Sequence, residues 1–172
     1  FMEKNANVAI LKLTIEKEWC LEMIDKIVND NPLKKMNNGF WEQILDEELK
    51  ECIIDAENYY TQMEYQKAIV SGFYKMLSIR DNYRNKYEAN IITMSSYNIY
   101  KYIENFLLIT YPICPHFVEY IWDYATSKGI NFSKTWPENV QINYELIYYR
   151  DTVNNIIDSC RSDIGNIIKR FF

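Results

Sequence analysis

Residues 107–122 read LLITYPICPHFVEYIW, and this stretch indicates two consecutive helices joined by a corner. Pro112 has no backbone N–H and cannot continue a helix, so it ends the first of the two. Pro115 has the backbone angle of a first helical residue, so it begins the second. The corner therefore favours a fold built from helices joined by short loops.

Apolar residues recur at three- and four-residue steps along most of the chain, as they do on one face of a helix. The expected helices cover residues 7–29, 41–60, 64–87, 93–111, 115–128 and 151–171. Asp151 and Thr152 are the expected start of the last helix. Its apolar stripe consists of Val153, Ile156, Ile157, Cys160, Ile164, Ile167, Ile168 and Phe171. Residues 129–149 show no helical period and are expected to be irregular. The sequence thus predicts an all-α, antiparallel bundle of five or six helices.

Length and composition restrict the possible functions. The chain has 172 residues and a net charge of −5, which fits one domain. It contains no run of eighteen apolar residues, so no membrane-spanning helix is expected. Four glycines are too few for the glycine-rich loops that hold phosphates. Because the chain opens on Phe1, we expect it to be a piece of a longer protein.

Cysteine and histidine are too sparse for the common metal and nucleophilic sites. Cys20, Cys52, Cys114 and Cys160 lie far apart, and we expect buried free thiols in a reducing cytoplasm. His116 is the only histidine, and a Cys/His pair would have to join it to Cys114, two residues away. We therefore predict no metal site and no catalytic residue, which disfavours a stand-alone enzyme.

The helix expected at residues 64–87 is basic, whereas residues 41–63 contain seven acids and one lysine. Its candidate contacts for an anion are Lys67, Lys75, Arg80, Arg84 and Lys86. Arg80 falls on the apolar side, so it either pairs with an acid inside the bundle or meets an anionic partner. The strip that holds Lys67, Lys75 and Lys86 is either a solvated face or a surface that faces phosphates.

Two features of the sequence concern helix packing. Gly72 lies in the middle of the basic helix, where glycine costs about 1 kcal/mol relative to alanine, so it is expected to allow a close helix crossing. The first helix is apolar nearly all round between Val8 and Ile15. Such a helix is buried on more than one side, either by its own bundle or by a missing neighbour.

The corner resembles part of the helical domain that follows the catalytic core in class I aminoacyl-tRNA synthetases of the leucine, isoleucine and valine group. The residues that match are Leu107, Leu108, Pro112, Pro115, His116, Glu119, Trp122, Trp136 and Pro137. A second stretch, with Gly72 before two aromatic residues and then Arg80-Asp81-x-Tyr83-Arg84, is similar to the eukaryotic and archaeal leucyl branch. The resemblance covers nearly the whole chain.

The matching residues of the corner have expected structural roles. His116 lies in the first turn of a helix, where it can bond a backbone group or Glu119 one turn later. Trp122 and Trp136 are expected to bury their rings, and each indole N–H is expected to find an acceptor.

The resemblance implies that residues 1–172 are an anticodon-binding helical domain from a cytoplasmic leucyl enzyme. Motifs of the catalytic core are absent, so the catalytic, editing and C-terminal domains of the parent are missing. The parent would join leucine to tRNA(Leu) with ATP and magnesium, whereas this segment would hold no cofactor. It would contact the tRNA backbone beside the catalytic domain of the same chain, away from any membrane. Net acidity leaves one alternative open, a helical scaffold or protein-interaction domain without a nucleic-acid role.

Overall fold

The computed structural model describes residues 3–30, 39–92 and 95–171, and within these ranges it contains helices and no strands. The helices are α1 (Glu3–Asp30), α2 (Phe40–Thr61), α3 (Tyr65–Ile69), α4 (Lys75–Glu88), α5 (Ser96–Thr110), α6 (Pro115–Ser127) and α7 (Tyr144–Phe171). A π-helical segment, η2 (Val70–Tyr74), joins α3 to α4, so residues 65–88 form one continuous helix. The predicted all-α class is confirmed.

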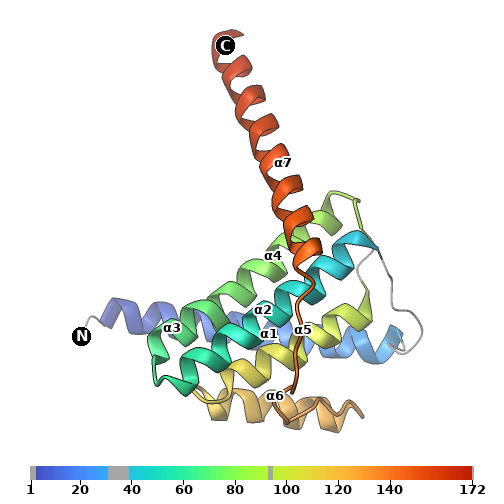
Figure 1. The fold of residues 1–172 in the computed structure, drawn as a ribbon. Coiled ribbons are helices and arrows are strands. Elements are labelled where there is room, and N and C mark those ends of the chain that lie inside the picture. Colours follow the sequence, from blue (N-terminus) through green and yellow to red (C-terminus); the bar gives the residue numbers. More distant parts are fainter. Residues whose placement is uncertain (1–2, 31–38, 93–94, 172) are drawn as a thin grey trace.

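Successive helices from α1 to α6 run back and forth and form a bundle, whereas α7 leaves the bundle as a single projecting helix (Figure 1). Within the bundle, α1 packs against α5 and α6, and α2 packs against α3, α4 and α5. The beginning of α7 contacts α2. The antiparallel arrangement was expected from the short loops, but the projection of α7 was not.

The core lies where α1, α2, α4, α5 and α6 meet. Its largest fully buried side chains are aliphatic or aromatic and include Ile24, Leu49, Met76, Phe106 and Ile121. They come from the apolar stripes that the three- and four-residue spacing marked in each helix. Full burial of such a side chain stabilises the fold by roughly 1.5–3 kcal/mol.

Gly72 allows the close helix crossing that the sequence predicted. A Cβ atom at this position would lie 2.4 Å from Cγ2 of Ile109 in α5 and 3.7 Å from Cβ of Ala56 in α2. Ile109 is itself buried and branched at Cβ, so it has little freedom to move away. Glycine therefore lets η2 lie against α2 and α5 together.

The two halves of α1 differ in burial. Cys20, Ile24 and Ile27 in the second half are buried in the core, whereas Leu11 and Ile15 in the first half are 59% and 51% exposed. Of the two alternatives for the apolar first half, burial by the bundle itself is therefore wrong for these side chains, and burial by a missing neighbour stays a prediction. Leu13 lines a cavity together with Phe73 of η2 and Ile113 of the corner, so the bundle covers only one side of the first half and leaves Leu11 and Ile15 exposed.

The last helix begins at Tyr144, so the predicted start at Asp151 and Thr152 is wrong, as is irregular structure at residues 144–149. The side-chain Oδ1 of Asn143 accepts hydrogen bonds from the backbone N–H groups of Glu145 (3.1 Å) and Leu146 (3.3 Å). These bonds satisfy donors that a first helical turn otherwise leaves free. The expected start of the fourth helix, residues 93–94, lies outside the described residues, and α5 is described from Ser96.

The four cysteines do not share one environment. Cys20 and Cys52 are fully buried as predicted, but Cys114 is half-buried and Cys160 is exposed. The prediction is wrong for Cys160 because the apolar stripe of α7 lies on the projecting part of the helix, where Ile164 is 57% exposed.

Candidate nucleic-acid interface

Arg80 makes an ion pair inside the bundle, which is one of the two alternatives that the sequence left open. Its Nη1 donates a hydrogen bond to Oε2 of Glu16 in α1, and its Nη2 lies 3.0 Å from Oδ1 of Asp81. The guanidinium carbon lies 4.8 Å from the ring centroid of Trp19. The Arg80 side chain is only 12% exposed, and each of its three nitrogens donates a hydrogen bond to Glu16 or Asp81.

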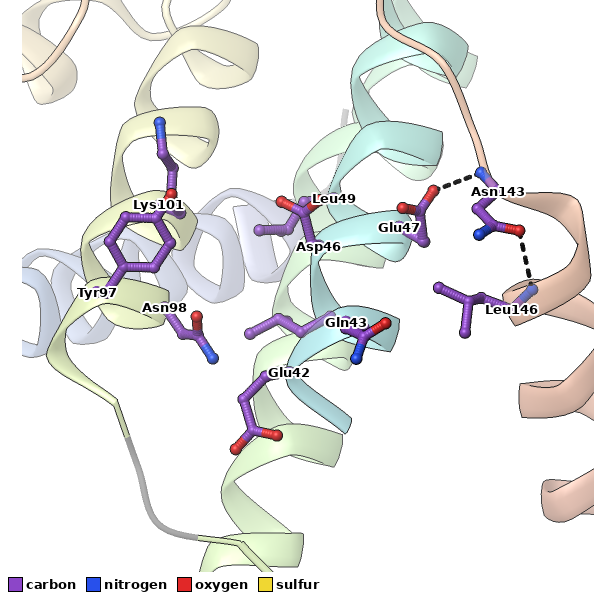
Figure 2. Close-up of a pocket in the computed structure, with 11 residues that line it drawn as sticks. Glu42, Gln43, Asp46, Glu47, Leu49, Tyr97, Asn98, Lys101, Asn143 and Leu146 are labelled. Carbon is purple, nitrogen blue, oxygen red and sulfur yellow. Dashed lines mark hydrogen bonds between the residues drawn. The ribbon is translucent and has the colours of Figure 1, made fainter. Parts of the chain in front are cut away.

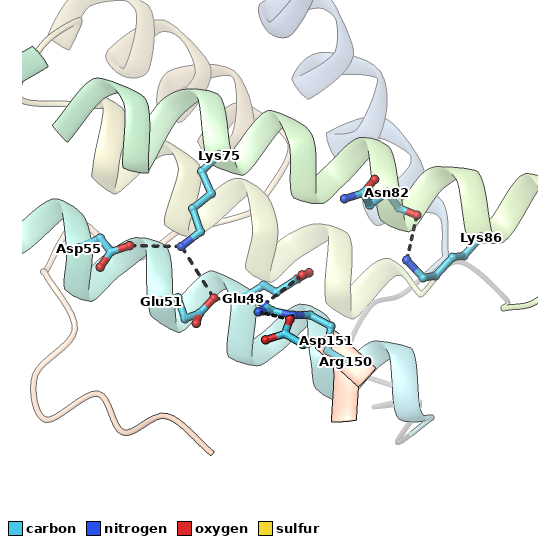
Figure 3. A network of polar contacts seen from close by, with 8 residues as sticks. All are labelled: Glu48, Glu51, Asp55, Lys75, Asn82, Lys86, Arg150 and Asp151. Atoms are coloured by element: carbon cyan, nitrogen blue, oxygen red, sulfur yellow. Dashed lines mark hydrogen bonds and ion pairs between the residues drawn. The ribbon is translucent and has the colours of Figure 1, made fainter. Parts of the chain in front are cut away.

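Three other basic residues of the helix at residues 65–88 are also paired with carboxylates. Lys67 Nζ lies 2.8 Å from Glu64 Oε2, and Arg84 lies 3.6 Å from both Asp81 and Glu88. Lys75 Nζ reaches across to α2, where it lies 3.2 Å from Asp55 Oδ2 and 3.7 Å from Glu51 Oε2 (Figure 3). The carboxylates of the acid-rich helix α2 thus neutralise part of the positive charge of the helix at residues 65–88.

Lys86 differs from the other four because it makes no ion pair with a described residue. Its Nζ donates a long hydrogen bond of 3.4 Å to the backbone oxygen of Asn82 and lies 4.3 Å from the ring centroid of Trp41 (Figure 3). Burial lowers the pKa of Lys86, the negative charge of Glu48 opposes this change, and Arg161 adds to it. An anion at Lys86 would therefore meet a cation that no carboxylate already holds.

Arg150 fixes the beginning of α7 on the acidic side of α2. Its Nη1 lies 3.4 Å from Glu48 Oε1 and 3.2 Å from Glu51 Oε2, and its Nε donates to Asp151 Oδ1 at 2.9 Å. Figure 3 shows that Glu51 serves both Arg150 and Lys75. The base of the projecting helix is thus tied to the same carboxylates that face the basic helix.

A cavity of about 320 Å³ lies between α2, α5 and the start of α7 (Figure 2). The carboxylates of Glu42, Asp46 and Glu47 line it, and its one ammonium group, on Lys101, lies 2.9 Å from a carboxylate oxygen of Glu104. Glu47 Oε2 accepts a hydrogen bond of 2.7 Å from the backbone N–H of Asn143. The negative wall disfavours phosphates here, so this cavity does not suit a nucleic acid.

The corner between α5 and α6 is built by Pro112 and Pro115, as the sequence predicted. His116 lies in the first turn of α6, but its side chain is 99% exposed and its Nδ1 lies 3.7 Å from Glu119 Oε2. The expected helix-start hydrogen bond from His116 is therefore not made, because the imidazole points into solvent. Replacing His116 should accordingly cost little stability.

The two tryptophans near the corner are packed, but their indole N–H groups are not hydrogen bonded. Trp122 is 6% exposed and packs against Tyr111, with ring centroids 5.2 Å apart. The Nε1 atoms of Trp122 and Trp136 are buried without a hydrogen-bond partner. The expectation of an acceptor for each is wrong, because both rings are held by apolar and aromatic packing. Pro137 follows Trp136 in the loop before α7.

The chain was compared with models of known protein families. The model of the anticodon-binding domain of tRNA ligases matches residues 42–167, which include the basic helix, the corner and most of α7. The chain belongs to this family. The match confirms the family that the corner and the basic helix resemble.

Curated relatives of this anticodon-binding domain are cytoplasmic leucine–tRNA ligases. That of Neurospora crassa is 30% identical over 165 residues, which is 94% of this chain and 14% of that protein. Those of Pongo abelii and Saccharomyces cerevisiae are 26% and 28% identical over 96% and 99% of this chain. The chain spans 14–15% of the length of these three relatives.

Within the described part of the anticodon-binding domain, no cluster of three or more His, Cys, Asp or Glu residues could hold a metal ion. Nor does any helix described here have the length and hydropathy needed to cross a bilayer.

The two buried thiols of the domain should make its stability fall at alkaline pH. Burial raises the pKa of Cys52 from 9.0 to about 12, and it also raises that of Cys20. Both folded-state values lie above the unfolded value, so stability is complete below pH 9 and is lost as pH rises. Each thiol should lower the free energy of unfolding by about 1.4 kcal/mol per pH unit above pH 9.

Urea denaturation between pH 8 and pH 11 measures this effect. The variant Cys20→Ala/Cys52→Ala should show a shallower decline with pH than the parent chain, whereas Cys160→Ala, which removes an exposed thiol, should keep the parent slope. Equal slopes in all three proteins would show that the buried thiols titrate normally.

Proposed function

We propose that this chain is the tRNA-binding helical domain of a cytoplasmic leucine–tRNA ligase and that it contacts the sugar-phosphate backbone of tRNA(Leu). The observation that supports this most is the match of residues 42–167 to the anticodon-binding domain of tRNA ligases. The names of the relatives are the source of the proposed amino acid, leucine, and of the proposed compartment, the cytoplasm. Leucine, ATP and magnesium would bind to other domains of the same polypeptide, and this domain would orient the tRNA for them.

The charge distribution favours weak attraction that is shared with those other domains. The chain has a net charge of −5, and four of the five basic candidates are paired with carboxylates. Exposed pairs such as Lys67–Glu64 contribute at most about 1 kcal/mol, so a phosphate can displace the carboxylate. The Arg80 side chain is only 12% exposed and each of its nitrogens bonds a carboxylate, so we propose that it supports the bundle and is not a phosphate contact. We therefore propose Lys86, Lys67 and Arg84 as phosphate contacts.

Lys86→Gln in the full-length ligase tests this proposal. The variant should raise the Michaelis constant for tRNA(Leu) about 2–5-fold, because a single lysine–phosphate contact at the half-buried Lys86 contributes up to about 1 kcal/mol. Leucine-dependent pyrophosphate exchange, which reports leucine activation at the other site, should not change. Lys75 is less suitable for this test, since its loss would remove the ion pair of Asp55 and leave Glu51 with Arg150 alone.

Lys26→Gln provides a matched control. Lys26 is an exposed lysine of α1 in a pair with Glu22 at 2.9 Å, and it lies on a different helix from the proposed contacts. The Lys26→Gln variant should leave both the Michaelis constant for tRNA(Leu) and the pyrophosphate exchange unchanged. A tRNA Michaelis constant that responds equally to both variants would mean that only net charge matters, and no response to Lys86→Gln would exclude this lysine as a contact.

One observation favours a protein-interaction role as a second candidate function. The first half of α1 and the projecting part of α7 expose large aliphatic side chains, among them Leu11 and Ile164 at 59% and 57%. Surfaces of this kind are common at protein interfaces. If the chain bound another protein but did not bind tRNA, this second role would be favoured.

A further inference from the structure

An apolar cavity of about 190 Å³ lies between the first half of α1, the η2 segment and the α5–α6 corner. Its wall includes Leu13 of α1, Phe73 and Tyr74 of η2, and Ile113 of the corner. Tyr74 and Ile113 remain 41% and 36% exposed at the rim. We refer to this cavity as the corner socket. It is distinct from the acidic cavity in Figure 2 and from the basic helix surface in Figure 3.

The wall of the corner socket contains one buried polar group without a partner. Thr110 is 4% exposed, and its Oγ1 is buried and makes no hydrogen bond. Two tyrosines also line the wall: the Tyr60 hydroxyl donates a hydrogen bond of 2.7 Å to the backbone oxygen of Ile109, and Tyr74 is 41% exposed at the rim. An unsatisfied buried hydroxyl costs roughly 1–3 kcal/mol, and this cost is already present in the structure before any ligand enters the socket.

The corner socket also has a positively charged side chain in its wall. Lys12 lines the socket, and its Nζ lies 4.6 Å from the ring centroid of Tyr74. No described carboxylate forms an ion pair with it. The socket therefore combines a largely apolar wall, the buried Thr110 hydroxyl and one cation that a negative group can approach.

This chemistry suits a protein side chain better than a nucleobase. A base carries several polar atoms on its edges, and most of them would lose water without gaining a partner in a wall that is mainly apolar. An apolar side chain loses nothing in this way. A cavity of roughly 150 Å³ holds a benzene molecule, so a side chain of the size of leucine or phenylalanine fits.

We propose that the corner socket holds one large apolar side chain, flanked by a carboxylate that faces Lys12, presented by another segment of the full-length ligase. This inference rests on the proposed function, because the chain covers only 14% of its Neurospora relative and such a polypeptide has ample further length to supply the segment. The docked segment would also cover part of the exposed first half of α1.

Alkylation of Cys114 by iodoacetamide tests the proposal, because this half-buried thiol lines the socket. In the full-length ligase without tRNA, modification measured by peptide mass spectrometry should be at least tenfold slower than in the 172-residue chain. Lys12→Glu in the full-length protein should restore fast modification. Lys17→Glu, also in α1 but over the Tyr120 ring at 5.5 Å, should leave the protection intact.

Thr110→Val separates docking from folding. This substitution removes the unbonded hydroxyl, so the thermal midpoint of the 172-residue chain should stay the same or rise. In the full-length ligase the apolar occupant makes no bond to Thr110, so the protection of Cys114 should be kept. Fast modification of Cys114 in this variant would mean that the occupant bonds the hydroxyl, and it would overturn the proposal. The comparison of Lys12→Glu with Lys17→Glu within the full-length protein stands even if the shorter chain does not fold.

Three other results would overturn the proposal: equal modification rates in the full-length and 172-residue proteins, protection that Lys12→Glu leaves unchanged, and protection that arises only when tRNA is added. The last would assign the socket to nucleic acid. If the full-length protein did not bind tRNA but Cys114 were still protected, the proposed function would be refuted. The proposal that another segment docks in the corner socket would then still stand.

Discussion

Arg80→Met is expected to lower the free energy of unfolding by about 3–5 kcal/mol, because it leaves the carboxylate of Glu16 buried without its partner. Glu16 is 4% exposed, so water cannot replace the guanidinium. Arg80 also covers the ring of Trp19, whose edge packs against Tyr102 with centroids 5.5 Å apart. The loss should appear in urea denaturation of the 172-residue chain at pH 7.

Arg84→Met is the matched control for Arg80→Met. Arg84 lies one turn later in the same helix and also has two carboxylates nearby, but its side chain is 46% exposed. Its replacement should cost less than about 1 kcal/mol. The double variant Glu16→Leu/Arg80→Met should regain part of the loss, since no charge is left unpaired. Equal effects of Arg80→Met and Arg84→Met would contradict the assignment of Arg80 to the core.

Trp122→Ala is expected to lower the free energy of unfolding by about 3–5 kcal/mol, because it removes a large buried ring that belongs to α6 and leaves a cavity. The ring contacts Tyr111 of the corner, and Lys134 Nζ lies 4.8 Å from its centroid. The angle between α5 and α6 should therefore loosen along with the core. Calorimetry would show the change as a lower thermal midpoint.

Trp122→Phe tests which part of the side chain matters. The Trp122 Nε1 atom has no hydrogen-bond partner, so its removal forfeits no hydrogen bond. The phenylalanine variant should retain most of the stability that the alanine variant loses. If both variants lost the same amount, the indole nitrogen would have to make a bond that the structure does not show.

The helices could be predicted from the sequence because their apolar periodicity and their prolines are local signals. Gly72 was informative for the same reason, since glycine inside a helix has a cost that a close crossing explains. The start of α7 was missed because its first turn has little periodicity of its own. That turn depends on the Asn143 side chain and on Arg150, whose carboxylate partners are about a hundred residues away.

The chemistry of the candidate interface was harder to predict for a similar reason. The sequence placed Arg80 on an apolar face and so indicated a partner, but it could not indicate Glu16, which is 64 residues away. It showed an acid-rich helix next to a basic one without showing that Glu51 and Asp55 would neutralise Lys75. The corner socket was missed entirely, because its wall comes from four separate parts of the chain.

The most direct test of the tRNA-binding role is the salt dependence of the affinity between the 172-residue chain and labelled tRNA(Leu), followed by fluorescence anisotropy. Contacts to the backbone predict weak binding whose logarithm falls linearly with the logarithm of salt concentration, with a slope of roughly −0.7 to −0.9 for each phosphate contact. Lys86→Gln should reduce that slope by about one contact. Absence of binding at low salt, or an affinity that does not change with salt, would contradict the role.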